Sequence, residues 1–315
     1  MPLLAPVSQN AVTRRAKPLL GTLVEIGLLT TNVSDLEQIQ VGIASRQADL
    51  AVYFDVGFAA LAQVQQTMSI HDSSSDLSVF NANVSVNWLK CAPQIIAVLG
   101  FAQALSARSE GVFDVFCKPS PLGAAITVGN WQDLVVDTAK GRVRKLAPLH
   151  ADLGGIAKGY AVDTAVDAIE QLAMRQQIAS PALVGGWVNA GGDVRVFGDC
   201  RIPMYVRDPK NIARAAWCKQ LYGSAAATSA QYYPAQTGKA THKYSVDSFP
   251  NGHLLDGQTG RVLNAEDTTG ASWTVFAPTC MAADALTKLA AAVGDTNSPM
   301  LQKILAHYGA SLWVL

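Results

Sequence analysis

The chain has 315 residues, half of them hydrophobic and 15% charged, which is enough for a large core in one domain or two. Its 24 basic and 24 acidic residues give a formal net charge of zero, which argues against a protein that binds nucleic acid or an anionic membrane surface. No apolar run is long enough for a transmembrane helix, so no membrane span is predicted.

The N-terminal residues do not resemble an export signal, because Arg14, Arg15 and Lys17 follow a short apolar start instead of preceding a longer apolar stretch. No lipoprotein cysteine is seen there. The five cysteines are scattered without a CxxC pair, which favours reduced thiols over a disulfide framework or a zinc site. The sequence therefore predicts a cytoplasmic protein, with a flexible segment over residues 1–17 and one compact domain over residues 18–315.

In chain order, the first predicted elements are a strand with Gly21 at a turn, an alanine-rich helix, a polar loop, and a helix with a proline near its start. They span residues 18–29, 41–66, 68–83 and 93–109. Either Ser75 or Ser78 is expected to cap a short helical turn in the polar loop. A loop with two prolines and a hairpin follow over residues 111–123 and 134–146.

The second half begins with a glycine-rich turn that leads into a helix over residues 152–176. A strand, a Gly-Gly-Asp turn and further strands are then predicted as far as Val206. The last elements are a strand, two helices and a strand, over residues 273–277, 281–293, 300–308 and 311–315. Because helices and strands mix without regular βαβ alternation, the predicted fold class is α+β, with mixed or antiparallel sheets flanked by helices.

The most informative stretch is the sequence DLGGIAKGYAVD, from Asp152 to Asp163. Two glycines ahead of a helix let the backbone approach a ligand, and the helix N-terminus carries partial positive charge that suits a phosphate. Lys158 would add a full cation, so this stretch predicts either an anion site or an ordinary helix start. Asp152 could cap the helix, hold a metal or bind a ribose hydroxyl.

Four other short motifs are explained by ordinary structural roles when each is taken alone. Gly191-Gly192-Asp193 predicts a tight turn, Thr228-Ser229 a turn, and Phe113-Asp114 an aromatic residue beside a cap. His253 alone fits a hydrogen-bonded histidine better than a catalyst.

Taken together and in this order, the motifs resemble those of the FAD:protein FMN transferase family, also called the ApbE family. DLGGIAKGYAVD is the most specific of them. The other matching segments are Leu20-Gly21-Thr22; Met68, Ser69, Ser75, Leu77 and Asn81; Phe113-Asp114; Pro121-Leu122; Asn189 with Gly191 to Asp193; Thr228-Ser229; His253 to Gly260; and Ala283 to Leu286.

The resemblance implies one compact α+β unit with a flavin cleft, which uses Mg²⁺ to transfer FMN from FAD to a Thr or Ser of an acceptor protein and releases AMP. It implies catalytic roles for Lys158 at the diphosphate, His253 as the base for the acceptor hydroxyl, and Asp284. Asp284 and the Gly155 carbonyl would be the metal ligands. The residues implied at the FAD site are Leu20, Gly21, His71, Val112, Phe113, Asp114, Asp152, Lys158, Thr228, Ser229 and His253.

One position departs from the family pattern at the metal site. The family has a metal-binding Thr four residues after the Asp, whereas this chain has Lys288, on the same helix face as Asp284. An ammonium group has no acceptor and cannot bind Mg²⁺, and Thr287 is rotated away from that face. Lys288 could replace the charge of the metal, pair with Asp284 or swing out. Two alternative functions therefore stay open: an FAD-binding protein without transfer, and an FAD pyrophosphate hydrolase.

Overall fold

The computed structural model describes residues 11–30, 39–116, 129–176, 183–209, 211–230, 256–259 and 272–315. Its largest element is a seven-stranded sheet in the order β1-β2-β6-β7-β10-β11-β12, and every neighbouring pair is antiparallel. The strands are β1 (Ala11–Leu19), β2 (Thr22–Thr30), β6 (Leu183–Ala190), β7 (Asp193–Gly198), β10 (Ala225–Ala230), β11 (Ser272–Ala277) and β12 (Ser311–Val314).

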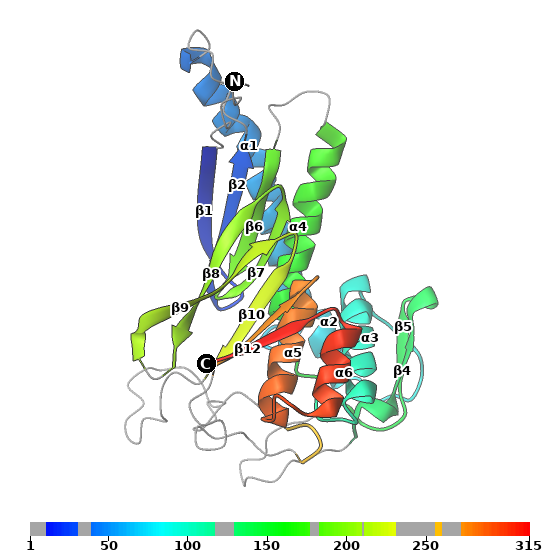
Figure 1. Cartoon of the computed structure of the whole chain (residues 1–315). Coiled ribbons are helices and arrows are strands. Elements are labelled where there is room, and N and C mark those ends of the chain that lie inside the picture. The colour runs from blue at the N-terminus through cyan, green and yellow to red at the C-terminus, as the bar shows by residue number, and fades with distance from the viewer. Residues whose placement is uncertain are drawn as a thin grey trace, which may run out of the picture.

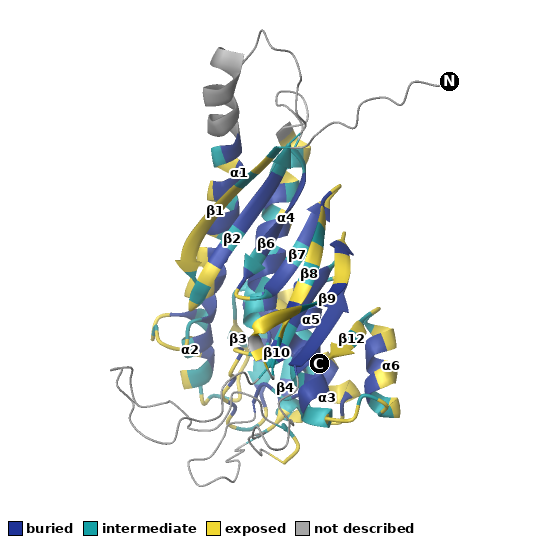
Figure 2. Ribbon diagram, turned by 60° about the vertical axis from the view of Figure 1, so that its left-hand side comes forward, coloured by how far each residue is buried: buried dark blue, intermediate teal, exposed yellow. Residues whose placement is uncertain are grey.

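Three helices, α1 (Ile39–Met68), α4 (Ala157–Gln176) and α5 (Cys280–Val293), pack side by side on one face of this sheet (Figure 1). Alternate residues of β2 point toward the helices, so that Val24, Ile26 and Leu28 are fully buried in the main core. Figure 2 shows the buried residues concentrated along the strands and the inner sides of the helices. Most residues of α5 are buried, because this helix packs against both α4 and the sheet.

The other face of the sheet carries a long hairpin, β8 (Arg201–Asp208) and β9 (Asn211–Tyr222). A second buried cluster includes Trp187 and Val196 from the sheet and Val206 and Leu221 from the hairpin. The two faces of the sheet are thus covered by different kinds of element, with helices on one side and a hairpin on the other.

The remaining elements are small. They are α2 (Asp76–Ala82), α3 (Pro93–Arg108), α6 (Pro299–His307), two 3₁₀ turns (Trp131–Asp133 and Thr138–Lys140) and a sheet of β3 (Leu89–Lys90), β5 (Arg142–Lys145) and β4 (Leu134–Asp137). Ser75 caps α2, because its side chain accepts the Ser78 N–H at 3.0 Å. Among the described residues, no helix combines the length and the apolar character that crossing a bilayer requires.

These elements confirm the predicted α+β class and the antiparallel sheets flanked by helices. The strand predicted over residues 18–29 is mostly β2, and Gly21 lies at a turn as expected. Both turn residues, Leu20 and Gly21, have positive φ (55° and 70°), and the turn joins β2 to β1 in a hairpin. The expected extent of the flexible segment is wrong for residues 11–17, which form most of β1. The extent of the single domain stays a prediction.

The basic residues of β1 explain why this strand is hard to recognise. Arg14, Arg15 and Lys17 are exposed, yet their cationic groups lie 4.9, 4.8 and 4.7 Å from the centroids of the Trp187, Phe54 and Phe58 rings. Such an edge strand lacks the alternation of apolar and polar residues that predicts a half-buried strand.

Glu110 occupies a left-handed backbone conformation just after α3, with a φ of 54°. The Gly111 N–H donates to the Ser106 carbonyl at 2.8 Å, as in a Schellman helix end, so Glu110 occupies the left-handed position that glycine normally takes. Glu110 is exposed, so burial of its side chain does not compensate for the strain of this backbone conformation.

We expect Glu110→Gly to raise the free energy of unfolding by about 0.5–1 kcal/mol, because glycine adopts positive φ without strain. Urea denaturation would measure it. The control is Ala107→Gly, at an exposed position inside the same helix, which should instead lose about 1 kcal/mol. Destabilisation of both variants would contradict the assignment of strain to Glu110.

Candidate functional site

The loop at the start of DLGGIAKGYAVD is held by backbone contacts from two sides. Asn81, at the end of α2, accepts the Ala151 N–H at 2.7 Å and donates its amide to the Ala151 carbonyl at 3.0 Å. The Asp152 N–H donates to the Val115 carbonyl at 2.7 Å, and the Asp152 carboxylate accepts the Gly154 N–H at 2.8 Å. Asp152 therefore shapes the turn that precedes α4, whose first residue is Ala157.

Lys158 lies in the first turn of α4 and forms an ion pair with Asp193, the first residue of β7. The tight turn that precedes Asp193 has positive φ at Gly191 (65°) and Gly192 (108°). Asp193 is only 2% exposed, whereas the Lys158 side chain is 36% exposed. The Gly-Gly-Asp motif is thus a tight turn that also delivers a buried carboxylate to the glycine-rich helix start.

The charges at this helix start interact strongly. Burial, followed by the charge of Asp284, raises the pKa of Asp193 to about 6, against the opposing effect of Lys158. Burial lowers the pKa of Lys158, but the carboxylates of Asp284 and Asp193 outweigh burial and raise that pKa above its ordinary value. Lys158 is therefore a permanent cation at neutral pH.

Asp284 lies on α5 and is fully buried. One of its carboxylate oxygens forms an ion pair with Lys288 one turn further along the helix, and the other accepts the Gly159 N–H at 3.0 Å. The stem of Lys288 lies against Gly155, since a Cβ on Gly155 would be 3.5 Å from Lys288 Cγ. Of the three alternatives for Lys288, the structure therefore has the pair with Asp284.

The predicted magnesium ligands do not fit a metal ion in this arrangement. Lys288 lies beside both Gly155 and Asp284, and both carboxylate oxygens of Asp284 already have hydrogen-bond donors. The Thr287 hydroxyl bonds to Ser229 at 2.7 Å and to the Asp284 backbone carbonyl at 2.7 Å, away from the carboxylate. Within the described ranges, no cluster of three His, Cys, Asp or Glu side chains could hold a metal.

Two further residues of DLGGIAKGYAVD fix α5 in place. Gly159 lies so close to α5 that a Cβ there would be 2.3 Å from the Cys280 carbonyl. Asp163 accepts the Cys280 and Met281 N–H groups, both at 2.8 Å, and so caps the start of α5. Sequence analysis missed both roles, although their spacing of four residues puts them on one face of α4.

The residues predicted at the FAD site lie in several places. Leu20 and Gly21 form the tip of the β1–β2 turn, and His71 is exposed in the loop after α1. Phe113 is buried, as is Ser229, and the Thr228 hydroxyl bonds to Thr274 at 2.9 Å. His253 lies outside the described residues, as do Pro121-Leu122 and Gly260.

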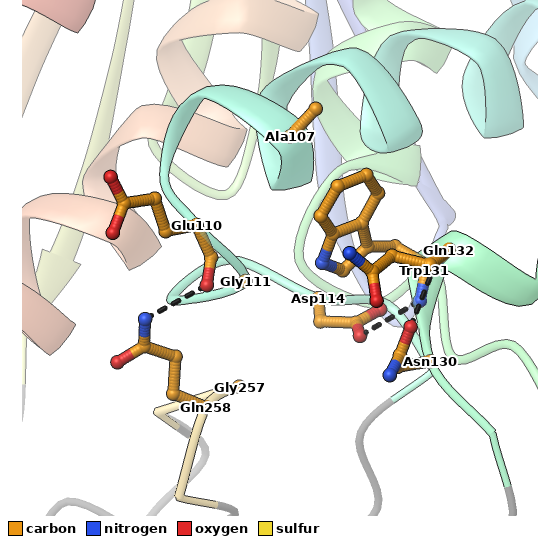
Figure 3. A pocket seen from close by; sticks show the side chains of 9 residues that line it. All are labelled: Ala107, Glu110, Gly111, Asp114, Asn130, Trp131, Gln132, Gly257 and Gln258. Carbon is orange, nitrogen blue, oxygen red and sulfur yellow. Dashed lines mark hydrogen bonds between the residues drawn. The ribbon is translucent and has the colours of Figure 1, made fainter.

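Val112 and Asp114 lie in the loop after α3. This loop borders a pocket of about 460 Å³, where Figure 3 shows Asp114. Asp114 lines this pocket, and its carboxylate accepts the Phe116 and Trp131 N–H groups at 2.9 and 3.1 Å. Burial raises the pKa of Asp114, and these two bonds oppose the rise. The residues that line the pocket are Ala107, Glu110, Gly111, Asp114, Asn130, Trp131, Gln132, Gly257 and Gln258.

The pocket is closed on one side by residues that follow His253 in the sequence. The Gly257 N–H donates to the Val112 carbonyl at 2.9 Å, and the Gln258 amide donates to the Glu110 carbonyl at 2.8 Å (Figure 3). Val115, in the same loop as Val112, accepts the Asp152 N–H with its backbone carbonyl. One loop therefore connects the pocket to the charged helix start.

Comparisons with known proteins agree with this architecture. The sequence profile described as the ApbE family matches residues 20–308. Two similar proteins, both named FAD:protein FMN transferase, come from Vibrio cholerae serotype O1 and Haemophilus influenzae. The first is 24% identical over 247 residues, covering 72% of this chain and 69% of the relative. The second is 28% identical over 261 residues, covering 72% and 68%.

Solved structures share the fold. The apo form of the flavinyl transferase ApbE from Pseudomonas stutzeri superposes with a TM-score of 0.69 at 20% identity, covering 100% of this chain and 92% of that chain. The ApbE protein from Thermotoga maritima has a TM-score of 0.67 at 21% identity, with 96% and 94% covered. With a family profile that spans nearly the whole sequence and the same fold in these structures, the chain belongs to the ApbE family.

Proposed function

We propose that this protein is an FAD:protein FMN transferase that attaches FMN to a Thr or Ser hydroxyl of an acceptor protein. The observation that carries the proposal is the helix start, where Lys158 and Lys288 bring two ammonium groups to the N-terminus of α4. Such a site suits the diphosphate of a dinucleotide such as FAD. The names of the two curated relatives support the same activity.

The transfer is a displacement at phosphorus. The acceptor hydroxyl oxygen forms a bond to the FMN phosphorus of FAD, and the bond from that phosphorus to the bridging oxygen breaks. AMP leaves with this oxygen, and the hydroxyl proton passes to a base, for which we propose His253. Such a reaction depends on positioning and on neutralising phosphate charge, to which Lys158 would contribute.

In this proposal, different parts of the site bind different parts of the FAD molecule. The pocket beside Asp114 would take one end of the FAD molecule, since about 460 Å³ suits a ring system but not a whole dinucleotide. The connection from Val115 to Asp152 would then place the diphosphate at Lys158. Leu20, Gly21, His71, Thr228 and Ser229 remain proposed contacts on the flavin side.

The test incubates the purified chain with FAD and an acceptor domain that carries a target Thr, with the acceptor's Thr→Val variant as control. We expect the FMN mass on the Thr acceptor only, with one AMP released for each FMN attached. FMN and AMP formed without an acceptor would favour the hydrolase and overturn the proposal. Bound FAD without any AMP would favour a flavin-binding protein and overturn it equally.

A further inference from the structure

Lys288 occupies the place between Gly155 and Asp284 that a cation is expected to fill. Its stem passes Gly155, and its ammonium group pairs with the fully buried Asp284 carboxylate. The opposite oxygen of Asp284 is bonded to the Gly159 N–H, which points from the first turn of α4. The carboxylate is thus satisfied from both sides by this chain's own groups.

The charges of this cluster balance without an added ion. Lys158 and Lys288 contribute two positive charges, and Asp193 and Asp284 contribute two negative charges. The four side chains form one electrostatic cluster, since the charges of both lysines and of Asp284 act on the Asp193 carboxylate. A divalent ion at Asp284 would lie beside the Lys288 ammonium and be repelled by it.

The ammonium group also has donors to spare for a ligand. It carries three N–H donors, and its hydrogen bond to Asp284, within the part of the chain that the structure describes, uses one of them. The Lys288 side chain keeps 20% of its surface exposed while Asp284 has none, so solvent reaches the lysine side chain and not the carboxylate. A phosphoryl oxygen that approaches the helix start from solvent would meet Lys288 before Asp284.

We propose that the Lys288 ammonium replaces a divalent cation in this protein and, with Lys158, binds the diphosphate of the nucleotide substrate through its N–H donors. The inference rests on the proposed transferase function and deepens it. In the transfer, the acceptor oxygen bonds to the FMN phosphorus, the hydroxyl proton passes to the base, and AMP leaves with the bridging oxygen, while Lys288 holds the diphosphate in place. The protein therefore works without added metal.

The first arm of the test measures metal binding directly. Titration of the wild type with Mn²⁺, followed by electron paramagnetic resonance, is expected to show no bound ion at this site. Lys288→Thr removes the competing cation and supplies a hydroxyl oxygen, so it should bind Mn²⁺, and its melting temperature should rise on adding Mg²⁺. Lys303→Thr removes an exposed lysine from α6 and is the charge-matched control, which should bind no ion.

The second arm measures flavin transfer with and without a chelator. The wild type and Lys303→Thr are expected to keep their rates within about twofold when metal is removed. Any transfer that the cation-retaining Lys288→Arg supports should be equally independent of metal. Lys288→Thr should lose about 100-fold in rate without metal and recover with Mg²⁺, because the phosphate charge is then neutralised only when the ion is bound.

The two arms separate the failure of this inference from that of the proposed function. Wild-type Mn²⁺ binding as tight as that of Lys288→Thr, or a loss of wild-type transfer on chelation, would overturn the role of Lys288 while leaving the transferase in place. A wild type without transfer under any condition would overturn the proposed function. The Mn²⁺ titration would then still decide whether Lys288 excludes the metal.

Discussion

Gly159→Ala is expected to be among the most damaging single changes in the protein. The added Cβ would lie 2.3 Å from the Cys280 carbonyl oxygen and 2.7 Å from Asp284 Cβ, so α5 would have to move away from α4. Neither contact is the end of a flexible side chain. We expect a loss of about 3 kcal/mol in the free energy of unfolding, measured by urea denaturation, because overpacking a rigid helix contact cannot be relieved locally.

A second glycine provides the matched control. Gly100 lies inside α3, and a Cβ built on it would contact nothing within 4 Å. Gly100→Ala should therefore gain up to about 1 kcal/mol from helix propensity alone. If Gly159→Ala were as stable as the wild type, the close packing of α4 on α5 would be refuted. The movement of α5 should also displace Asp284 and Lys288, so the rate of FMN transfer is expected to fall even under conditions where the variant is folded.

Lys158→Met is expected to combine a loss of transfer with a stability loss that depends on pH. The variant leaves Asp193 buried without its ion-pair partner, and removing one member of a buried pair costs about 3 kcal/mol. Because the Lys158 side chain is partly exposed, the expected loss in the free energy of unfolding is at the lower end of the range for a broken buried ion pair. Urea denaturation at pH 5 and pH 8 would measure the cost.

The direction of the pH effect follows from Asp193. Its pKa is about 6 in the intact pair, raised from 3.8, and it should rise further without Lys158. Between these pKa values the native state binds more protons than the unfolded state, so stability falls as pH increases from about 4 through the folded pKa, and is then flat. The variant should therefore be more damaged at pH 8 than at pH 5.

The double variant Lys158→Met/Asp193→Asn separates stability from chemistry. Removing the buried charge should restore most of the stability at pH 8, because the remaining amide no longer needs a counter-charge. Transfer should stay low, since the cation at the diphosphate is still missing. Equal stability of the single variant at pH 5 and pH 8 would show that Asp193 carries no uncompensated charge there.

Local sequence patterns predicted most of the regular structure. The helix predicted over residues 93–109 is Pro93–Arg108, and the hairpin over residues 134–146 contains β4 and β5. One part of the site was predictable for the same reason, because it depends on residues that are close together in the sequence. Residues four apart share a helix face, so the pairing of Lys288 with Asp284 was one of the alternatives that the sequence itself offered.

The other parts of the site depend on contacts between residues far apart in the chain. Asp193 belongs to a motif that predicts only a turn, and its pairing with Lys158 arises because β7 begins beside the N-terminus of α4. Gly159 and Asp163 give no signal of their own, since their partners at the start of α5 lie more than a hundred residues later.

What the sequence determined by itself was the order of most of the elements, the family resemblance, the glycine-rich helix start and the substitution at Lys288. What only the tertiary structure decided was which charges meet. Periodicity and capping act within a few residues, whereas a buried ion pair depends on how the sheet and its helices pack. Packing of α4 against α5 and β7 therefore turns four separate charged residues into one neutral cluster, with Lys288 where a metal ion was expected.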